Sequence, residues 1–150
     1  MSDNLEQIEK ILRSVIETLE DGYKGFAESG KEFEDATIKT FFLEESQVRA
    51  RFASELENEL SHLSVKRVRE RGTTTRTLHR TWAEVKAHLG GGDHTLLVTA
   101  EQGENRACEA YERSLKENLP ADVEEVLKRQ QQYIIQSHAK VRMWRDAACC

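Results

Sequence analysis

The stretch from Asp35 to Leu63 reads DATIKTFFLEESQVRARFASELENELSHL. Apolar residues recur in it every three or four positions, and Glu and Arg fill the opposite side, which is the pattern of an amphipathic helix. Asp35 stands before the first apolar residue, where its carboxylate can accept hydrogen bonds from the N–H groups at the helix start. Glu45 interrupts the apolar stripe. The stripe itself consists of Ile38, Phe41, Phe42, Val48, Phe52, Leu56, Leu60 and Leu63.

The end of this helix is open between Leu63 and Gly72. Val65 and Val68 could extend the apolar stripe as far as a glycine C-cap at Gly72. Alternatively, the basic stretch 66–71 already belongs to a loop. Both interpretations fit the sequence.

Three further stretches predict long helices of the same kind. Asn4 and Asp93 are the predicted N-caps of the first two, and Pro120 is the predicted first residue of the last. Ser29 and Gly30 are predicted to end the first helix. No stretch shows the alternation of a strand, so the fold class is all-α. The three stripes are Leu5, Ile8, Leu12, Val15, Leu19, Gly22 and Phe26; Leu96, Leu97, Ala100, Ala107, Tyr111 and Leu115; and Val123, Leu127, Ile134, Val141 and Trp144.

The lengths of the connections predict the topology. The first and last links are short, so each joins an antiparallel helix pair. The middle link carries the stripe Leu78, Trp82, Val85 and Leu89 and ends at three glycines from Gly90. A helix of about 12 residues spans ~18 Å and could return the chain along much of the bundle. We therefore expect two antiparallel hairpins joined by a long crossover that contains a short helix, with Trp82 as its anchor.

Composition narrows the class of protein. A chain of 150 residues has the length of one domain, 1–150, and a net charge of -5 with 33% charged residues is typical of a soluble, mixed-sign surface. Residues 1–10 are polar, so neither a signal peptide nor a membrane segment is expected, and the predicted location is cytoplasmic. The basic residues between Lys66 and Arg80 lack interleaved aromatics, so nucleic acid is not an expected partner. Three cysteines make no disulfide framework or zinc motif, and Cys108 is predicted to be a small core residue.

Several segments resemble a bacterial family of ferritin-like four-helix-bundle proteins that is a domain of unknown function. They are LHRTWAEVK at 78–86, LEDGYKGF at 19–26, the Glu101-x-x-Glu104 run, LPA at 119–121 and the segment 131–138. The resemblance extends over nearly the whole chain and implies a ferritin-like bundle. It implies no activity, because the fold alone does not determine one.

Polar residues break the apolar stripes of all four predicted helices. Glu20 lies ten residues before Gly30 and Glu45 ten after Asp35, so both are ~15 Å from the first turn. Glu101 lies eighteen residues before Leu119 and His138 eighteen after Pro120, so these two are also at equal distances from the turn between their helices. In the expected topology these groups fall within about one helical turn of the same height. They are Glu20, Glu45, Glu101 with its neighbour Glu104, and His138.

Carboxylates and a histidine from four helices at one height form the kind of site that holds iron or manganese pairs. The full pattern also needs two Glu-x-x-His pairs, and Val48 and Ile135 stand where their missing members belong. The alternative is a satisfied buried network, in which His138 pairs with Glu101 or Glu45. In either case the excess negative charge must be protonated, solvated or balanced by a cation.

Two functions follow from these residues. The first is a non-catalytic bundle with a carboxylate and histidine layer left from a di-metal site, and no nucleophile and base motif indicates an enzyme. The second is a metal-binding redox or storage protein of the ferritin-like class, with iron or manganese. The crossover helix either docks on its own bundle or offers a surface for a second subunit, so a homodimer is one of two alternatives.

Overall fold

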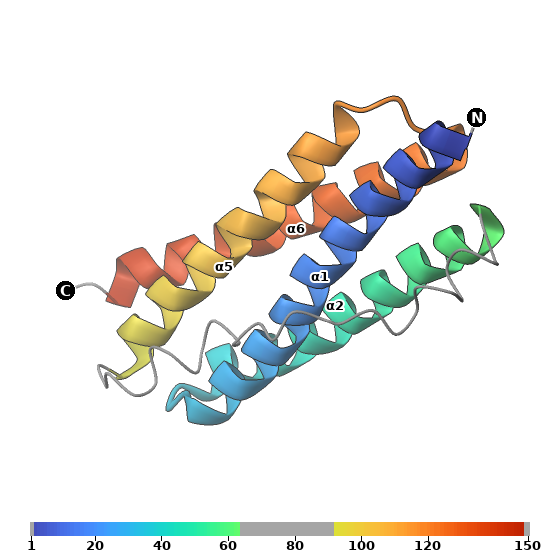
Figure 1. The fold of residues 1–150 in the computed structure, drawn as a ribbon. Helices are drawn as coiled ribbons and strands as arrows, with labels where there is room; N and C mark the ends of the chain where they lie inside the picture. The colour runs from blue at the N-terminus through green and yellow to red at the C-terminus, as the bar shows by residue number, and fades with distance from the viewer. Residues whose placement is uncertain (1, 64–91, 149–150) are drawn as a thin grey trace.

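The computed structural model describes residues 2–63 and 92–148, which form four long α-helices and no strand. The sequence prediction of an all-α four-helix bundle is therefore confirmed (Figure 1). The predicted crossover helix, its anchor Trp82 and any extension of the second helix toward Gly72 lie outside the described residues. The helices are α1 (Ser2–Glu32), α2 (Ala36–Leu63), α5 (Gly92–Leu115) and α6 (Ala121–Ala148).

The helices pack as two antiparallel hairpins, α1 with α2 and α5 with α6 (Figure 1). α1 also packs along α5, so that α2 and α5 lie diagonally across the bundle and run parallel. The turn between α5 and α6 lies beside the N-terminal end of α1. Of the helix pairs that are in contact, α2 and α6 pack together least closely. Long side chains therefore have to fill the seam between these two helices.

One of the two aspartate caps is confirmed and the other was wrong. The backbone N–H of Ile38 donates to Asp35 Oδ1 at 2.9 Å, as expected at the start of α2. Asp93 does not cap α5, because that helix begins one residue earlier, at Gly92, whose φ is 70°. Its carboxylate instead accepts the N–H groups of Glu34 at 3.0 Å and Asp35 at 3.2 Å. Asp93 thus fastens α5 to the α1–α2 turn.

The predicted ends of two helices also need correction. α1 continues through Ser29 and Gly30 to Glu32, because both residues are buried against α2. A Cβ on Gly30 would lie 2.8 Å from Leu43 Cδ2, so this glycine permits close packing rather than ending the helix. α6 begins at Ala121, and Pro120 precedes it with its carbonyl accepting the Glu124 N–H at 2.9 Å.

The hydrophobic core is divided into two clusters by a polar layer. The larger cluster contains Leu12, Val15, Leu19, Val48, Phe52, Leu56, Tyr111, Leu127 and Ile134, among others. The smaller one contains Phe26, Phe33, Ile38, Phe42, Leu96, Leu97, Ala100 and Val141. The polar layer between the clusters contains buried side chains of α2, α5 and α6, among them Arg49, Glu104 and Ser137.

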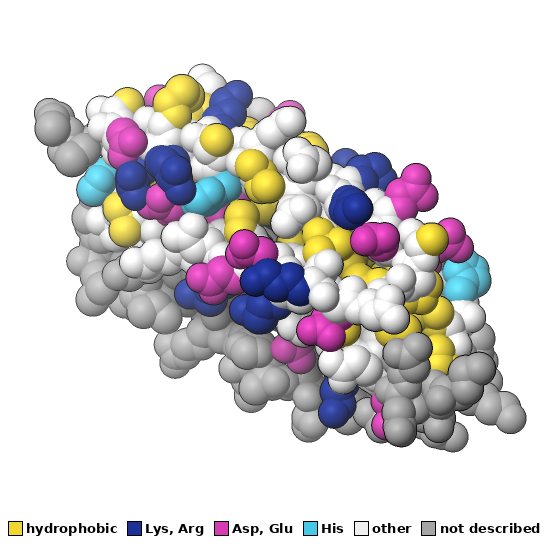
Figure 2. Space-filling view, turned by 90° about the horizontal axis from the view of Figure 1, so that it is seen from above, with side chains coloured by type: hydrophobic (Ala, Val, Ile, Leu, Met, Phe, Trp, Pro, Cys, Tyr) yellow, Lys and Arg dark blue, Asp and Glu magenta, His cyan; other side chains and the backbone are white. Residues whose placement is uncertain are grey.

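The surface has charges of both signs. On the face drawn in Figure 2, acidic and basic side chains are interspersed, with hydrophobic side chains between them. This arrangement is the one expected from a composition with 33% charged residues and a net charge of only -5. None of the helices in the described ranges is long and apolar enough to cross a membrane.

Candidate functional site

Arg49 occupies the centre of the polar layer. Its side chain is only 1% exposed, although it carries a charge. Nη1 donates to Glu45 Oε1 at 2.8 Å, one turn earlier on α2, and Nη2 donates to Glu104 Oε2 at 2.8 Å, on α5. Both carboxylates are also buried. A single guanidinium therefore binds one carboxylate on its own helix and one on α5, diagonally across the bundle, with the short distances typical of charged hydrogen bonds.

α6 completes the layer with two hydroxyl groups. Ser137 Oγ accepts a hydrogen bond from Arg49 Nη2 at 3.1 Å and donates one to Glu104 Oε2 at 3.1 Å. The Tyr133 hydroxyl donates to Glu45 Oε2 at 2.6 Å. Each carboxylate thus has one ionic and one hydroxyl partner. The layer joins three helices through side chains alone.

α1 provides an uncharged wall for the guanidinium. The Phe26 ring lies with its centroid 4.9 Å from Arg49 Cζ, a distance that gives a cation–π contact. Gly22 lies one turn before Phe26, and a Cβ there would be 3.5 Å from Arg49 Cγ. Arg49 Nε has no hydrogen-bond partner among the described residues. The charged end of the side chain is satisfied by carboxylates, and its inner part is enclosed by α1.

The electrostatics of the layer keep Arg49 charged. Burial alone would lower the pKa of Arg49, but the carboxylates of Glu104 and Glu45 more than offset it, so the pKa is raised. Burial raises the pKa of Glu104 despite the attraction of Arg49. The pKa of Tyr133 is raised to about 12 by burial and by its hydrogen bond to Glu45. Strong alkali should therefore disturb this layer, because it removes the Tyr133 proton that Glu45 accepts.

A second, more exposed cluster surrounds Glu101 at the seam between α5 and α6. Arg145 Nη1 and Arg142 Nε both donate to its carboxylate, the latter at 3.3 Å. His138 Nε2 is 4.0 Å from Glu101 Oε2, which is too far for a hydrogen bond, and this buried nitrogen has no partner among the described residues. Burial and then Arg142 lower the pKa of His138, so its imidazole is neutral at pH 7.

The structure therefore separates the predicted site residues. Glu45 and Glu104 belong to the Arg49 layer, whereas Glu101 and His138 belong to the second cluster. Glu20, on α1, is half-buried, and its side chain is also engaged in an interaction. The sequence did not predict this separation, because Glu101 and Glu104 are less than one turn apart along α5 but direct their carboxylates to different partners.

These donors do not fit a dinuclear metal centre in the arrangement found. Within residues 2–63 and 92–148, no group of three or more His, Cys, Asp or Glu side chains could hold a metal ion. The guanidinium of Arg49 already bridges the two buried carboxylates, and a divalent cation at the same place would be repelled by it. Ile135, at the position of a missing ligand, is 45% exposed. The ligand role of these residues stays a prediction.

Arg49 was missed because arginine in a charged helix is normally exposed. The signal was present in the sequence. Arg49 is seven residues after Phe42 and seven before Leu56, so it lies on the buried row of α2, and it follows Glu45 by four. An oppositely charged pair on an apolar row is a sign of a buried ion pair.

Fold and site together define an all-α four-helix bundle with a buried arginine–carboxylate layer in its core. The chain belongs to the family described as "Domain of unknown function (DUF2383)", whose model matches residues 7–117. That match includes Arg49, Glu45 and Glu104 but ends before α6, which supplies Tyr133 and Ser137. A search among curated proteins finds no match.

Proposed function

We propose that this protein is a non-catalytic, ferritin-like helical scaffold in which Arg49 takes the role that a metal cation has in metal-binding bundles. The observation that carries the proposal is the pair of 2.8 Å contacts from one buried guanidinium to Glu45 and Glu104. These contacts supply positive charge from within the chain, and a balancing cation was one of the three ways in which the excess negative charge could be accommodated.

The chemistry of the surrounding groups supports a structural role. Burial raises the pKa of the Cys108 thiol, with a smaller effect from Glu104, so little of the nucleophilic thiolate forms at neutral pH. Burial also raises the pKa of Tyr111, whose hydroxyl donates to Gln130 Oε1 at 2.7 Å. These side chains stabilise the interior and have no proton to exchange near neutral pH.

The test is metal analysis of protein purified without chelator, followed by thermal melts with and without millimolar Mn²⁺ or Fe²⁺. Magnesium chloride at equal ionic strength is the control for nonspecific salt effects. The proposal predicts far less than one transition-metal ion per chain and an unchanged Tm. A metal ion bound stoichiometrically, with a Tm that rises with its concentration, would contradict it.

The second candidate is the metal-binding redox or storage protein, with iron or manganese. One observation favours it: His138 presents a neutral imidazole with an unbonded Nε2 beside Glu101, which is the state that binds metals. Arg142 and Arg145 oppose it, because both already bind that carboxylate. In the experiment above, a metal-induced rise in Tm that disappears in His138→Ala would favour this candidate.

A further inference from the structure

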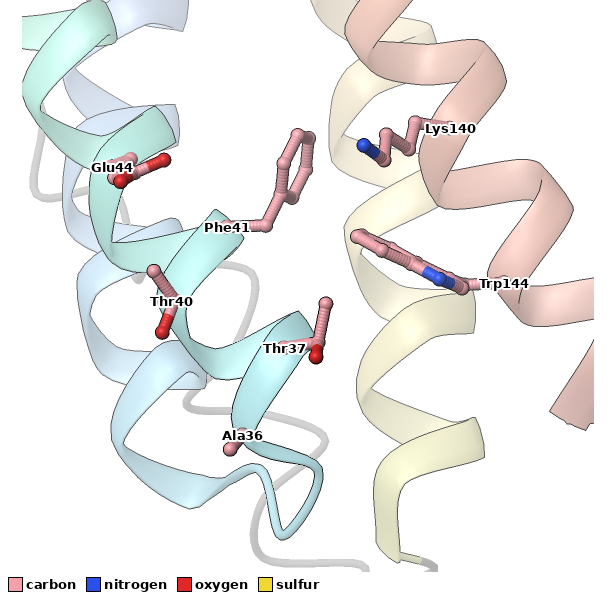
Figure 3. A pocket seen from close by; sticks show the side chains of 7 residues that line it. All are labelled: Ala36, Thr37, Thr40, Phe41, Glu44, Lys140 and Trp144. Carbon is pink, nitrogen blue, oxygen red and sulfur yellow. The ribbon is translucent and has the colours of Figure 1, made fainter.

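A solvent-open groove lies in the loosely packed seam between α2 and α6. Its volume is about 460 Å³. Figure 3 shows the α2 residues on one wall and the α6 residues on the other. The groove is separate from the Arg49 layer and from the Glu101 cluster. It is lined by Ala36, Thr37, Thr40, Phe41, Glu44, Lys140 and Trp144.

Two aromatic rings form a corner in this groove. The ring centroids of Phe41 on α2 and Trp144 on α6 are 5.0 Å apart, and the rings are inclined at 79°. Both side chains are only partly buried, so their rings are accessible from the groove. Two rings at nearly a right angle can both turn a negative face toward the same space. Aromatic cages bind cations in this way.

A cation of the protein itself occupies this corner. The Lys140 ammonium lies 5.5 Å from the centroid of Phe41 and 5.3 Å from that of Trp144, both within the range of a cation–π contact. Lys140 makes no ion pair with another described residue, and its side chain is exposed. It therefore marks the position that a positive charge prefers, and no ion pair to those residues holds it there.

Glu44 gives the groove a negative charge on the opposite wall. It lies on α2 one turn from Phe41, and its exposed carboxylate has no ion pair or hydrogen bond with another described residue. The hydroxyl-bearing residues Thr37 and Thr40 lie on the same wall. A cation in the corner would thus have two aromatic faces as neighbours, in a groove whose lining also includes the Glu44 carboxylate.

We propose that this groove is a binding site for a small organic cation with a methylated ammonium group, which takes the place of the Lys140 ammonium. A quaternary ammonium has no N–H donors to strip of water, so it leaves water more easily than a lysine ammonium does. The flexible stem of Lys140 allows its charge to move back into solvent. The site does not depend on the proposed structural role of Arg49.

The test is a titration with choline that is monitored by the fluorescence of Trp144. The full-length protein carries Trp82→Phe, so that Trp144 is its only tryptophan. The uncharged isostere 3,3-dimethylbutan-1-ol is the matched ligand, and NaCl keeps the ionic strength constant. The affinity for choline should be at least about fivefold higher than the affinity for the alcohol, because choline gains two cation–π contacts. Lys140→Met should tighten choline binding about fivefold by removing the internal competitor, and Glu44→Gln should weaken it.

Several results would overturn the proposal. Equal binding of choline and the alcohol would show only an apolar groove, and no saturable change with Lys140→Met would show no site at all. Binding that survives Phe41→Leu in a variant with unchanged far-UV circular dichroism would place the cation elsewhere. The last measurement uses phosphatidylcholine vesicles. Binding to these vesicles without binding to free choline would mean that the ligand is a lipid headgroup and not a small molecule.

Discussion

Arg49 on α2 and Glu104 on α5 form a buried ion pair at 2.8 Å between helices that face each other diagonally. Their side chains are 1% and 3% exposed. The pair links the first hairpin to the second through the middle of the core. A buried charge is tolerated only when its partners are in place, so the pair makes one arrangement of the hairpins much more favourable than others.

Replacement of Arg49 by methionine should lower the free energy of unfolding by about 3–5 kcal/mol, because it leaves Glu45 and Glu104 buried without their cation. Urea denaturation at pH 7 measures the loss. The matched control is Arg51→Met, two residues on along α2, where the side chain is exposed and the expected change is within about 0.5 kcal/mol. Similar effects of the two substitutions would mean that the Arg49 charge contributes little.

The two glutamates of α5 should respond differently to amide substitution. Glu104→Gln weakens the buried pair with Arg49 and should cost about 2 kcal/mol or more. Glu101→Gln should cost less, about 1 kcal/mol, because its partners Arg142 and Arg145 are 53% and 30% exposed and can be hydrated instead. Equilibrium unfolding of both variants gives the comparison. A larger loss for Glu101→Gln would refute the assignment of the core layer to Glu104.

Tyr133 should make the protein sensitive to alkali. Its pKa of about 12 in the folded state is above the usual value of 10, so its contribution to stability is complete below pH 10 and is lost as the pH rises toward 12. Tyr133→Phe removes this contribution together with the hydrogen bond to Glu45. Unfolding free energies of both proteins between pH 9 and 12 should therefore converge at high pH. Parallel curves would exclude the raised pKa.

His138 should make the stability of the protein depend on pH in the opposite direction, with a loss of stability in acid. Its pKa in the folded state is below the usual 6.5, so the unfolded chain binds the proton more readily. The contribution of His138 to stability is present above 6.5 and is lost as the pH falls through the lowered pKa. His138→Gln should lose less stability than the parent protein between about pH 7 and 5. An equal loss in the two proteins would show that the imidazole pKa is not lowered.

Much of the fold could be predicted from the spacing of apolar residues, because each helix buries a regular stripe. Glu45 was correctly expected to be inward and partnered, since it broke such a stripe. Its main partner, Arg49, could not be distinguished from a surface arginine by residue type. Asp93 was expected to cap its own helix, but its carboxylate binds the α1–α2 turn instead. A cap that acts between elements could not be predicted, because it depends on which turn lies beside it.

The level of a residue along the bundle was easier to predict than the direction of its side chain. Glu101 and His138 do approach each other, as one alternative had it, but at 4.0 Å they form no hydrogen bond. Glu104 was expected beside Glu101, yet its carboxylate turns to Arg49. Rotations of less than one helical turn decide these pairings, and they depend on how the helices pack.

A double-mutant cycle on Arg49 and Glu104 tests the central claim most directly, namely that an internal cation neutralises the buried carboxylates. Urea unfolding of the parent, Arg49→Met, Glu104→Gln and the double variant gives the coupling free energy between the two side chains. The structure predicts a coupling of about 2 kcal/mol or more, with the double variant more stable than the sum of the single losses allows. A coupling near zero, with additive losses, would contradict it.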